Sequence, residues 1–197
     1  MSETRSYPRH VKTDAGDIEF RMMARADEPA VLAFAQMLPT HDLLFLPRNI
    51  SQPKVLSAWV NEIERGAITS LLAVKGGAVV GCGTLVRDPH SWSPHVGEIR
   101  MVVSQEVRGQ GVGRALSQET FALALCAGLE KLSVQMTVDQ QAAITLFESL
   151  GFKAEALLRD HVRDVDGKKH DIVVLGHNVA QVRAQLEAYG LPGAVQH

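Results

Sequence analysis

A stretch rich in glycine and arginine carries the clearest chemical signal in this sequence. Arg108-Gly109-Gln110-Gly111-Val112-Gly113-Arg114 follows an apolar run and precedes a segment with helical periodicity. A strand that ends in such a turn and continues into a helix leaves backbone N–H groups unpaired at the helix N-terminus. Glycines let an anion approach these groups, while the helix dipole and the arginines add positive charge. The stretch therefore predicts a site for a pyrophosphate.

Two common phosphate-binding loops do not fit this spacing. The P-loop requires Gly-x-x-x-x-Gly-Lys-Ser/Thr, which the sequence does not contain. The dinucleotide-binding fingerprint requires Gly-x-Gly-x-x-Gly after the first strand of a βαβ unit. Here the glycines are spaced Gly-x-Gly-x-Gly and come after a predicted hairpin. The anion site must therefore belong to another kind of fold.

The cysteines and histidines show no spacing that is typical of metal ligands. The chain has two cysteines and eight histidines, and they do not form pairs at ligand distances along the sequence. Cys82 and Cys126 both lie among apolar residues, which predicts two buried, reduced thiols of an intracellular protein. We expect no metal site and no disulfide.

The predicted elements place the glycine stretch between a strand and a helix. Hydrophobic periodicity and capping residues predict helices after Asp27, from Ser51 to Arg65, from about Gly111 to Ala127, over 140–150, and in the tail. Strands are predicted over 18–24, over 96–104, over 131–138, and as two hairpins, 69–86 and 152–179, which turn at Gly76-Gly77 and at Asp166-Gly167. Residues 87–95 form a predicted loop.

The order of these elements is β-α-α-β-β-β-α-β-α-β-β with a further helix at the C-terminus. This order predicts an α+β (mixed α/β) fold whose central sheet is mostly antiparallel and is flanked by helices. We expect one domain over residues 18–179, a polar N-terminal lead over 1–17, and a C-terminal helix and tail over 180–197.

Composition excludes several classes of partner. Twenty basic and 22 acidic side chains give a formal net charge of −2, with no basic cluster, so nucleic acid is not an expected partner. The polar N-terminus does not resemble a signal peptide, and no apolar stretch reaches the ~20 residues of a membrane span. We expect a cytoplasmic protein that does not enter a membrane.

Two motifs together resemble one protein family. Arg108-x-x-Gly111-x-Gly113 resembles the acetyl-CoA signature, (Q/R)-x-x-G-x-(G/A), of the GCN5-related N-acetyltransferase (GNAT) family. The segment DQQAAITLFESLGF, residues 139–152, is similar to that family's second signature, a helix that ends in Leu-Gly-Phe. The hairpins before and after also lie where the family has them, so the resemblance covers residues 18–177. It implies a GNAT-like fold and acetyl-CoA as co-substrate.

The resemblance implies which residues hold the donor. The backbone of the strand before the glycine loop, at Met101 and Val103, would pair with the pantetheine arm. A backbone N–H near Val102 or Val103 would stabilise the oxyanion. Gln140 stands where the family often has Asn, beside the pantetheine. The full set of implied donor-binding residues is Met101, Val102, Val103, Arg108, Gly109, Gln110, Gly111, Val112, Gly113, Arg114, Gln140, Ala143 and Phe147.

Acetyl transfer needs a base for the amine and a way to release the thiolate. Glu98 is the candidate base, because it lies on the strand that leads to the donor site; the alternative is that it pairs with Arg100 or another cation. Phe147 stands where the family commonly has a Tyr that is proposed to protonate the thiolate, and phenylalanine cannot donate a proton. The thiol is a fair leaving group without help, since its pKa is about 8.5.

These features leave three hypotheses for the function. The first is an acetyl-CoA-dependent N-acetyltransferase that acts on a primary amine, with a small molecule favoured over a protein as acceptor. The second is a CoA-binding sensor or structural module, for which Phe147 is the main argument. The third is an interaction protein whose glycine turn is only structural. The resemblance also implies that His41, His90 or His95 can line the acceptor pocket, and that a homodimer can form.

Overall fold

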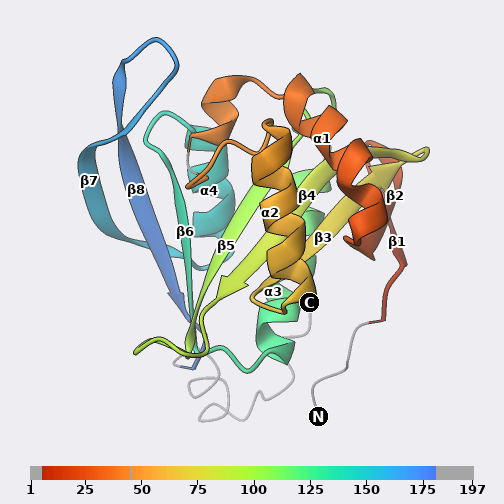
Figure 1. The fold of residues 1–197 in the computed structure, drawn as a ribbon. Helices are drawn as coiled ribbons and strands as arrows, with labels where there is room; N and C mark the ends of the chain where they lie inside the picture. Colours follow the sequence, from red (N-terminus) through yellow and green to blue (C-terminus); the bar gives the residue numbers. More distant parts are fainter. Residues whose placement is uncertain (1–5, 45, 181–197) are drawn as a thin grey trace.

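The computed structural model describes residues 6–44 and 46–180. They form one eight-stranded sheet with the strand order β1-β2-β3-β4-β5-β6-β8-β7 (Figure 1). The strands are β1 (Arg9–Thr13), β2 (Gly16–Met22), β3 (Ile68–Lys75), β4 (Ala78–Arg87), β5 (Val96–Val103), β6 (Lys131–Thr137), β7 (Lys153–Arg163) and β8 (Lys169–Asn178). Every neighbouring pair is antiparallel except β5 and β6, which are parallel. The predicted mixed, mostly antiparallel sheet is thus confirmed.

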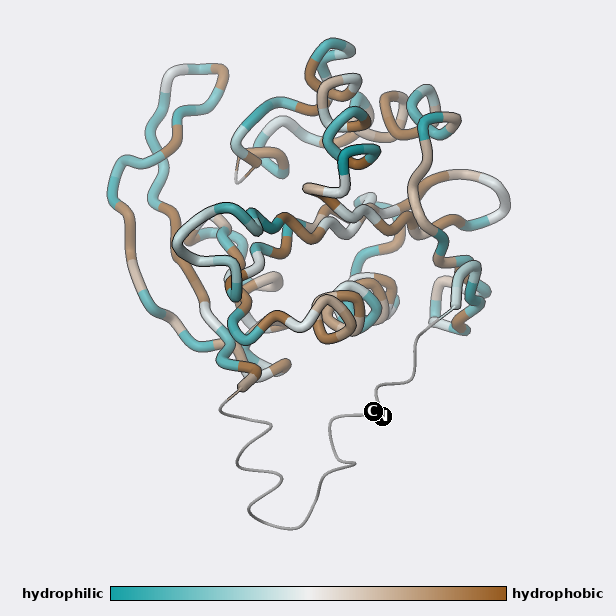
Figure 2. Tube along the Cα trace, turned by 60° about the horizontal axis from the view of Figure 1, so that its bottom comes forward, coloured by the Kyte–Doolittle hydropathy of each residue, from teal (hydrophilic) through white to brown (hydrophobic). Residues whose placement is uncertain are grey.

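Within the described residues, helices α1 to α4 cover the two faces of the sheet, as Figure 2 shows from a second direction. They are α1 (Glu28–Met37), α2 (Pro53–Glu64), α3 (Val112–Cys126) and α4 (Gln141–Ser149), with short 3-10 turns η1 (Arg25–Asp27), η2 (Thr40–Leu43) and η3 (Gln105–Val107). Leu72 packs with the residues of α1 and α2, whereas its neighbour Leu71 packs with those of α3. Because both faces are buried, β3 and β4 are apolar almost throughout.

The structure adds one strand to the predicted order. Residues 9–13, which the sequence places in a polar lead outside the domain, form β1 and pair with β2 from Arg9 opposite Phe20 to Thr13 opposite Gly16. This edge strand exposes His10 and Lys12. Its polar composition therefore does not indicate that it pairs with β2. The helix predicted over the tail lies almost entirely outside the described residues.

The strands β5 and β6 separate after a short paired stretch. They pair only from Val96 opposite Lys131 to Ile99 opposite Val134. Beyond this point β5 stays beside β4 up to Val103, while β6 stays beside β8 up to Thr137. The sheet therefore contains a wedge-shaped split that opens at the C-terminal ends of β5 and β6 (Figure 1).

The two cysteines differ in exposure, which corrects the prediction that both are buried. Cys82 on β4 is 1% exposed, and burial raises the pKa of its thiol to about 12. Cys126 is exposed, because it ends α3 on the side that faces away from the sheet. Apolar neighbours in the sequence do not decide burial on a helix, since neighbouring residues point in different directions.

We expect one thiol to react in the folded protein. A chromogenic disulfide reagent at pH 8 should modify Cys126 at once and Cys82 only after unfolding, because the thiolate is the reactive form and Cys82 is both inaccessible and protonated. The Cys126→Ser variant is the control and should show no fast reaction. Two fast-reacting thiols in the folded wild type would contradict the burial of Cys82.

A buried histidine makes the fold sensitive to acid. His177 on β8 is 7% exposed, its Nδ1 has no hydrogen-bond partner among the described residues, and its ring lies 5.2 Å from those of Phe121 and Phe152. Burial lowers the pKa of His177 below its ordinary value of 6.5. The folded protein therefore keeps this ring neutral at a pH where the unfolded chain already binds a proton.

The lowered pKa of His177 decides how the stability of the fold changes with pH. Because the folded pKa is lowered, stability is fully present above pH 6.5 and falls as the pH drops toward the folded-state pKa, with a slope of at most about 1.4 kcal/mol per pH unit. The His177→Leu variant should lose less stability than the wild type between pH 7 and pH 5, measured by urea unfolding. The exposed control His161→Leu should keep the wild-type slope; equal slopes in all three proteins would refute the assignment.

Candidate donor site in the split sheet

A cavity of about 700 Å³ occupies the open end of the split. Its walls are the C-terminal half of β5, the glycine loop, the end of β6, and the first turns of α4. Among the predicted donor-binding residues it is lined by Met101, Val102, Val103, Arg108, Gly109, Gly111, Gly113, Arg114, Gln140, Ala143 and Phe147. The fold thus brings together residues from two motifs about 30 positions apart.

The glycine loop has the backbone conformation that an anion cradle needs. Gly109 and Gly111 have φ angles of +71° and +82°, in the left-handed region that other residues rarely adopt. Gly111 is the N-cap of α3, and no side chain bonds to the N–H groups of the first turn from that position. These N–H groups and the positive end of the helix dipole therefore point toward the cavity entrance.

The backbone of β5 presents hydrogen-bonding groups to the split. Ser104 donates its N–H to the Val80 carbonyl of β4 at 2.8 Å. Because N–H and C=O groups alternate in direction along a strand, those of Val102 also face β4, and those of Met101 and Val103 face β6. The split therefore exposes a strand edge to which an extended, amide-containing arm could pair.

Arg108 links the glycine loop to two other segments. Its Nε and Nη2 donate to the Val103 carbonyl at 3.2 and 3.0 Å, and Nη2 lies 2.7 Å from Asp42 Oδ2. The Asp42 side chain is only 15% exposed. Sequence reasoning missed Asp42, because nothing in the local pattern of the η2 turn indicates a partner 66 residues away.

On the other side of the split, Gln140 and Phe147 have different roles. Gln140 precedes α4, and its Oε1 accepts from the Thr137 N–H at 3.2 Å, which fixes the corner between β6 and α4. Phe147 is 4% exposed and its ring lies 5.2 Å from that of Phe152. Phe147 therefore belongs to the core as well as to the cavity wall.

Three predicted site residues do not line the cavity. Val112, the first residue of α3, is fully buried, and Gln110 donates its side-chain amide to the Glu106 carbonyl at 2.7 Å. Glu98 accepts from Arg100 Nε at 2.8 Å and from Nη2 at 3.0 Å, with both side chains mostly buried. By strand alternation Glu98 shares the face of Val102, under α1 and α2, where β5 and β6 still pair.

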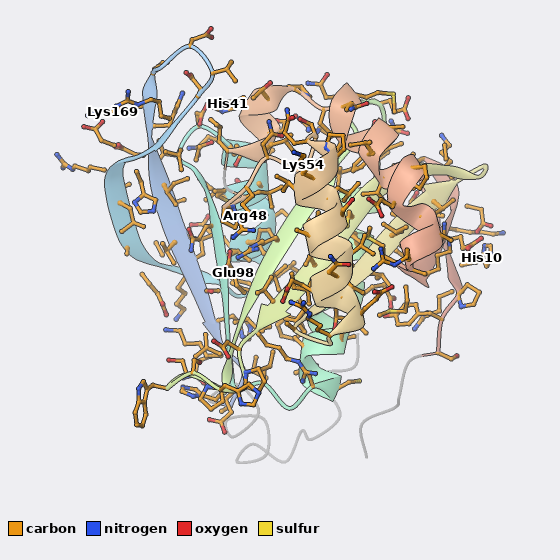
Figure 3. The ribbon with its side chains drawn as sticks, in the orientation of Figure 1. His10, His41, Arg48, Lys54, Glu98 and Lys169 are labelled. Carbon is orange, nitrogen blue, oxygen red and sulfur yellow. The ribbon has the colours of Figure 1, made fainter. Side chains whose placement is uncertain are left out.

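Only one of the three histidines predicted for an acceptor pocket lies near the cavity. His90 and His95 belong to the exposed loop before β5, at the opposite end of that strand from the cavity. His41 lies at the open end of the split, well apart from Glu98 (Figure 3). Its Nε2 is 2.8 Å from Asp139 Oδ2 and 3.4 Å from Thr137 Oγ1.

Asp139 is ionised in this setting. Burial raises the pKa of its carboxyl, but hydrogen bonds from Thr137 and its own backbone, together with His41, outweigh burial and leave the pKa below its ordinary value.

Among residues 6–44 and 46–180, no three His, Cys, Asp or Glu side chains gather as ligands for a metal ion. In the same part of the chain, no helix is long and apolar enough to cross a membrane.

Comparison with known protein families identifies the family to which this fold and cavity belong. Residues 34–152, which include the glycine loop, the split and α4, match the acetyltransferase (GNAT) family. The chain belongs to the GNAT family. Among solved structures, a GNAT acetyltransferase from Streptococcus pneumoniae is similar to it with a TM-score of 0.71 and 20% identity, covering 82% of this chain and 99% of that one. A putative acetyltransferase from Salmonella typhimurium, solved with its cofactor acetyl-CoA, has a TM-score of 0.70 and 18% identity, covering 82% and 94%.

Curated GNAT relatives match a shorter region. A probable N-acetyltransferase family 8 member 5 of Mus musculus is 37% identical over 84 residues, which are 42% of this chain and 37% of the mouse protein. A putative phosphinothricin acetyltransferase of Bacillus subtilis is 31% identical over 83 residues, 42% of this chain and 50% of that protein. The matched region thus spans half or less of these relatives.

Proposed function

We propose that this GNAT protein transfers an acetyl group from acetyl-CoA to a primary amine. The observation that carries the proposal is the cavity in the split, where a strand edge and the N-terminus of α3 converge. The pyrophosphate would lie on the N–H groups of the glycine loop beside Arg114, and the pantetheine arm would pair with Met101 and Val103. The Salmonella relative that binds acetyl-CoA in the same fold supports this assignment.

The chemical steps need few side chains. A neutral amine attacks the thioester carbonyl, the C–S bond breaks, and the thiolate takes up the second amine proton directly or through water. Since the Val102 N–H faces β4, the Val103 N–H is the better placed of the two predicted oxyanion donors. Phe147 offers no proton, so the leaving thiolate relies on its own low basicity.

Glu98 is the proposed base for the amine. It is mostly buried, and its ion pair with Arg100 occupies both carboxylate oxygens, so one of these bonds must give way to a proton or a water. The sequence analysis gave an ion pair with Arg100 as the alternative to a catalytic role for Glu98, and this ion pair is present. Mutation separates the two possibilities.

A thiol-release assay with acetyl-CoA over a panel of primary amines tests the proposed function. If Glu98 is the base, Glu98→Gln should lower turnover at pH 7 by about 10²-fold or more, while acetyl-CoA still binds. The exposed control Glu130→Gln should retain wild-type turnover. Binding of acetyl-CoA without turnover of any amine would favour the second hypothesis, a CoA sensor or structural module, which Phe147 supports.

The acceptor is proposed to be a small-molecule amine rather than a protein. The names of the relatives include both kinds: phosphinothricin acetyltransferase and, from Schizosaccharomyces pombe, N-alpha-acetyltransferase 30, which is 23% identical over 127 residues. A cytoplasmic location and a homodimer stay predictions from the sequence and from the family resemblance.

A further inference from the structure

The donor cavity has a closed end as well as an open one. Strands β5 and β6 pair for the last time at Ile99 opposite Val134, and both of these residues line the cavity. The glycine loop follows the other end of β5. A CoA molecule whose pyrophosphate lies on that loop, and whose arm pairs first with Val103 and then with Met101, extends its acetyl group along β5 toward the closed end.

The two faces of β5 beside this stretch differ in polarity. Ile99, which is 2% exposed, and Met101 pack in an apolar cluster with residues of α3 and α4. The other face carries Glu98 and Arg100, whose side chains are 24% and 20% exposed. Because an ammonium group enters an apolar core only at a large desolvation cost, the acceptor amine should reach the thioester over the face of Glu98 and Arg100.

Arg100 and Glu98 form an ion pair with two hydrogen bonds. Arg100 Nε donates to Glu98 Oε1 at 2.8 Å, and Nη2 donates to Oε2 at 3.0 Å. In the sheet Arg100 lies opposite Thr84, and Glu98 lies opposite Val86 on β4 and Ser133 on β6. None of these neighbours is charged, and within the described residues Glu98 is the one carboxylate that pairs with Arg100. If the pair opens, no neighbour in the sheet supplies either group with an opposite charge.

This pairing conflicts with the role of Glu98 as a base. When Glu98 takes a proton from the acceptor, it loses the charge with which Arg100 is paired. A mostly buried guanidinium without a counter-charge is costly, because it has given up hydration and gained nothing in return. An acceptor with an anion beside its amine removes this cost. Its ammonium group binds Glu98 while its anion binds Arg100, and a carboxylate fits the guanidinium with two parallel hydrogen bonds.

We propose that Arg100 binds a carboxylate of the acceptor, and that the acceptor is an α-amino acid or a small molecule with the same adjacent ammonium and carboxylate groups. The acceptor exchanges partners with the ion pair. Its ammonium group then gives one proton to Glu98, the neutral amine attacks the thioester carbonyl, the C–S bond breaks, and the thiolate takes up the second amine proton. This inference rests on the proposed function, because it takes the split as the donor site and Glu98 as the base.

Two CoA conjugates of similar size test this without requiring turnover. In both, a two-carbon bridge joins the CoA sulfur to a nitrogen that stays basic, which belongs to glycine in one conjugate and to glycinamide in the other. Calorimetry at pH 6, where both nitrogens carry a proton, should show that the wild type binds the glycine conjugate about tenfold or more tightly than the glycinamide conjugate.

Variants of the two ion-pair residues should change this preference in opposite directions. In Arg100→Gln it should fall to about twofold or less, because the carboxylate of glycine loses its partner. In Glu98→Gln it should be at least as large as in the wild type, because Glu98 no longer competes with that carboxylate for Arg100. Arg100→Lys keeps the charge but not the two parallel bonds, so it should also reduce the preference, and it serves if Arg100→Gln does not fold.

The controls separate the possible failures. CoA alone should bind equally to the wild type and to Arg100→Gln, and Arg159→Gln, which removes an exposed arginine of β7, should keep the wild-type preference. Equal binding of both conjugates by the wild type, or an unchanged preference in both Arg100 variants, would overturn the proposal. If CoA binds and the conjugates are not distinguished, only this inference fails. If CoA itself does not bind, the proposed function fails as well.

Discussion

Substitution of valine for Gly111 should weaken the binding of acetyl-CoA by about tenfold or more. Gly111 has a φ of +82°, and a side chain in this region costs roughly 1–2 kcal/mol, more when it is β-branched. The loop can escape this strain only by changing φ, which turns the first N–H groups of α3 away from the anion. We expect affinity measured by calorimetry to fall at least about tenfold, which corresponds to about 1.4 kcal/mol.

Gly113 provides the matched control within the same loop. Its φ is not in the left-handed region, and an added Cβ would meet only Leu146 and Val103 side-chain atoms at 3.8 and 3.9 Å, which is ordinary contact. Gly113→Ala should therefore bind acetyl-CoA within about threefold of the wild type, since no backbone strain is introduced. Equal affinity of Gly111→Val and the wild type would mean that the loop does not hold the donor and would favour the purely structural hypothesis.

Removal of the Asp27 carboxylate should destabilise the fold more than removal of an exposed, ion-paired carboxylate. Asp27 accepts from Arg21 Nη1 and Nη2 at 2.8 and 2.7 Å and from the Ala24 N–H at 2.9 Å, and its side chain is 12% exposed. Asp27→Ala leaves the guanidinium and the N–H without their acceptor at the start of α1. We expect a loss of about 2 kcal/mol, and a Tm lower by about 4–8 °C.

The pH dependence identifies the cause of this loss. The bonds from Arg21, and to a smaller degree that from Ala24, hold the pKa of Asp27 below its ordinary value of 3.8 despite its burial. The stabilisation is therefore present above pH 3.8 and is lost as the pH falls through the folded-state pKa. The difference between Asp27→Ala and the wild type should shrink over that range. Glu64→Ala removes a similar but exposed pair with Arg25 and should change Tm within experimental error, because solvent screens such pairs.

Local signals in the sequence predicted most of the fold. Gly76 and Gly77 adopt the positive φ angles that their hairpin requires, and periodicity located α2 and α3 within two residues at each end. Such features depend on neighbouring residues alone. The strand β1 and the exposure of Cys126 were missed, because an edge strand pairs on one side only and a helix turns each residue to a different direction.

The sequence predicted most of the residues that line the cavity along β5, the glycine loop and α4, but it missed two aspartates at the open end of the split. The residues of the glycine loop and of α4 that line the cavity were identified, since each motif is contiguous. Asp42 and Asp139 were not, because their partners, Arg108 and His41, come from distant segments that only the tertiary fold brings together. The sequence does not distinguish His90 and His95 from His41, whereas the strand direction places them at the other end of β5.

The short parallel ladder between β5 and β6 divides the sheet into two halves that are joined by few hydrogen-bonded pairs. Four residue pairs connect strands β1–β5 to strands β6–β8 within the sheet. An extended ligand in the split would extend this ladder, because it would form backbone hydrogen bonds with the part of β5 that β6 does not pair with. Ligand binding should then raise the protection of the Met101 and Val103 amides against hydrogen exchange. It should also couple the unfolding of the two halves of the sheet. The substrate would thus serve, for as long as it is bound, as a ninth strand of the sheet.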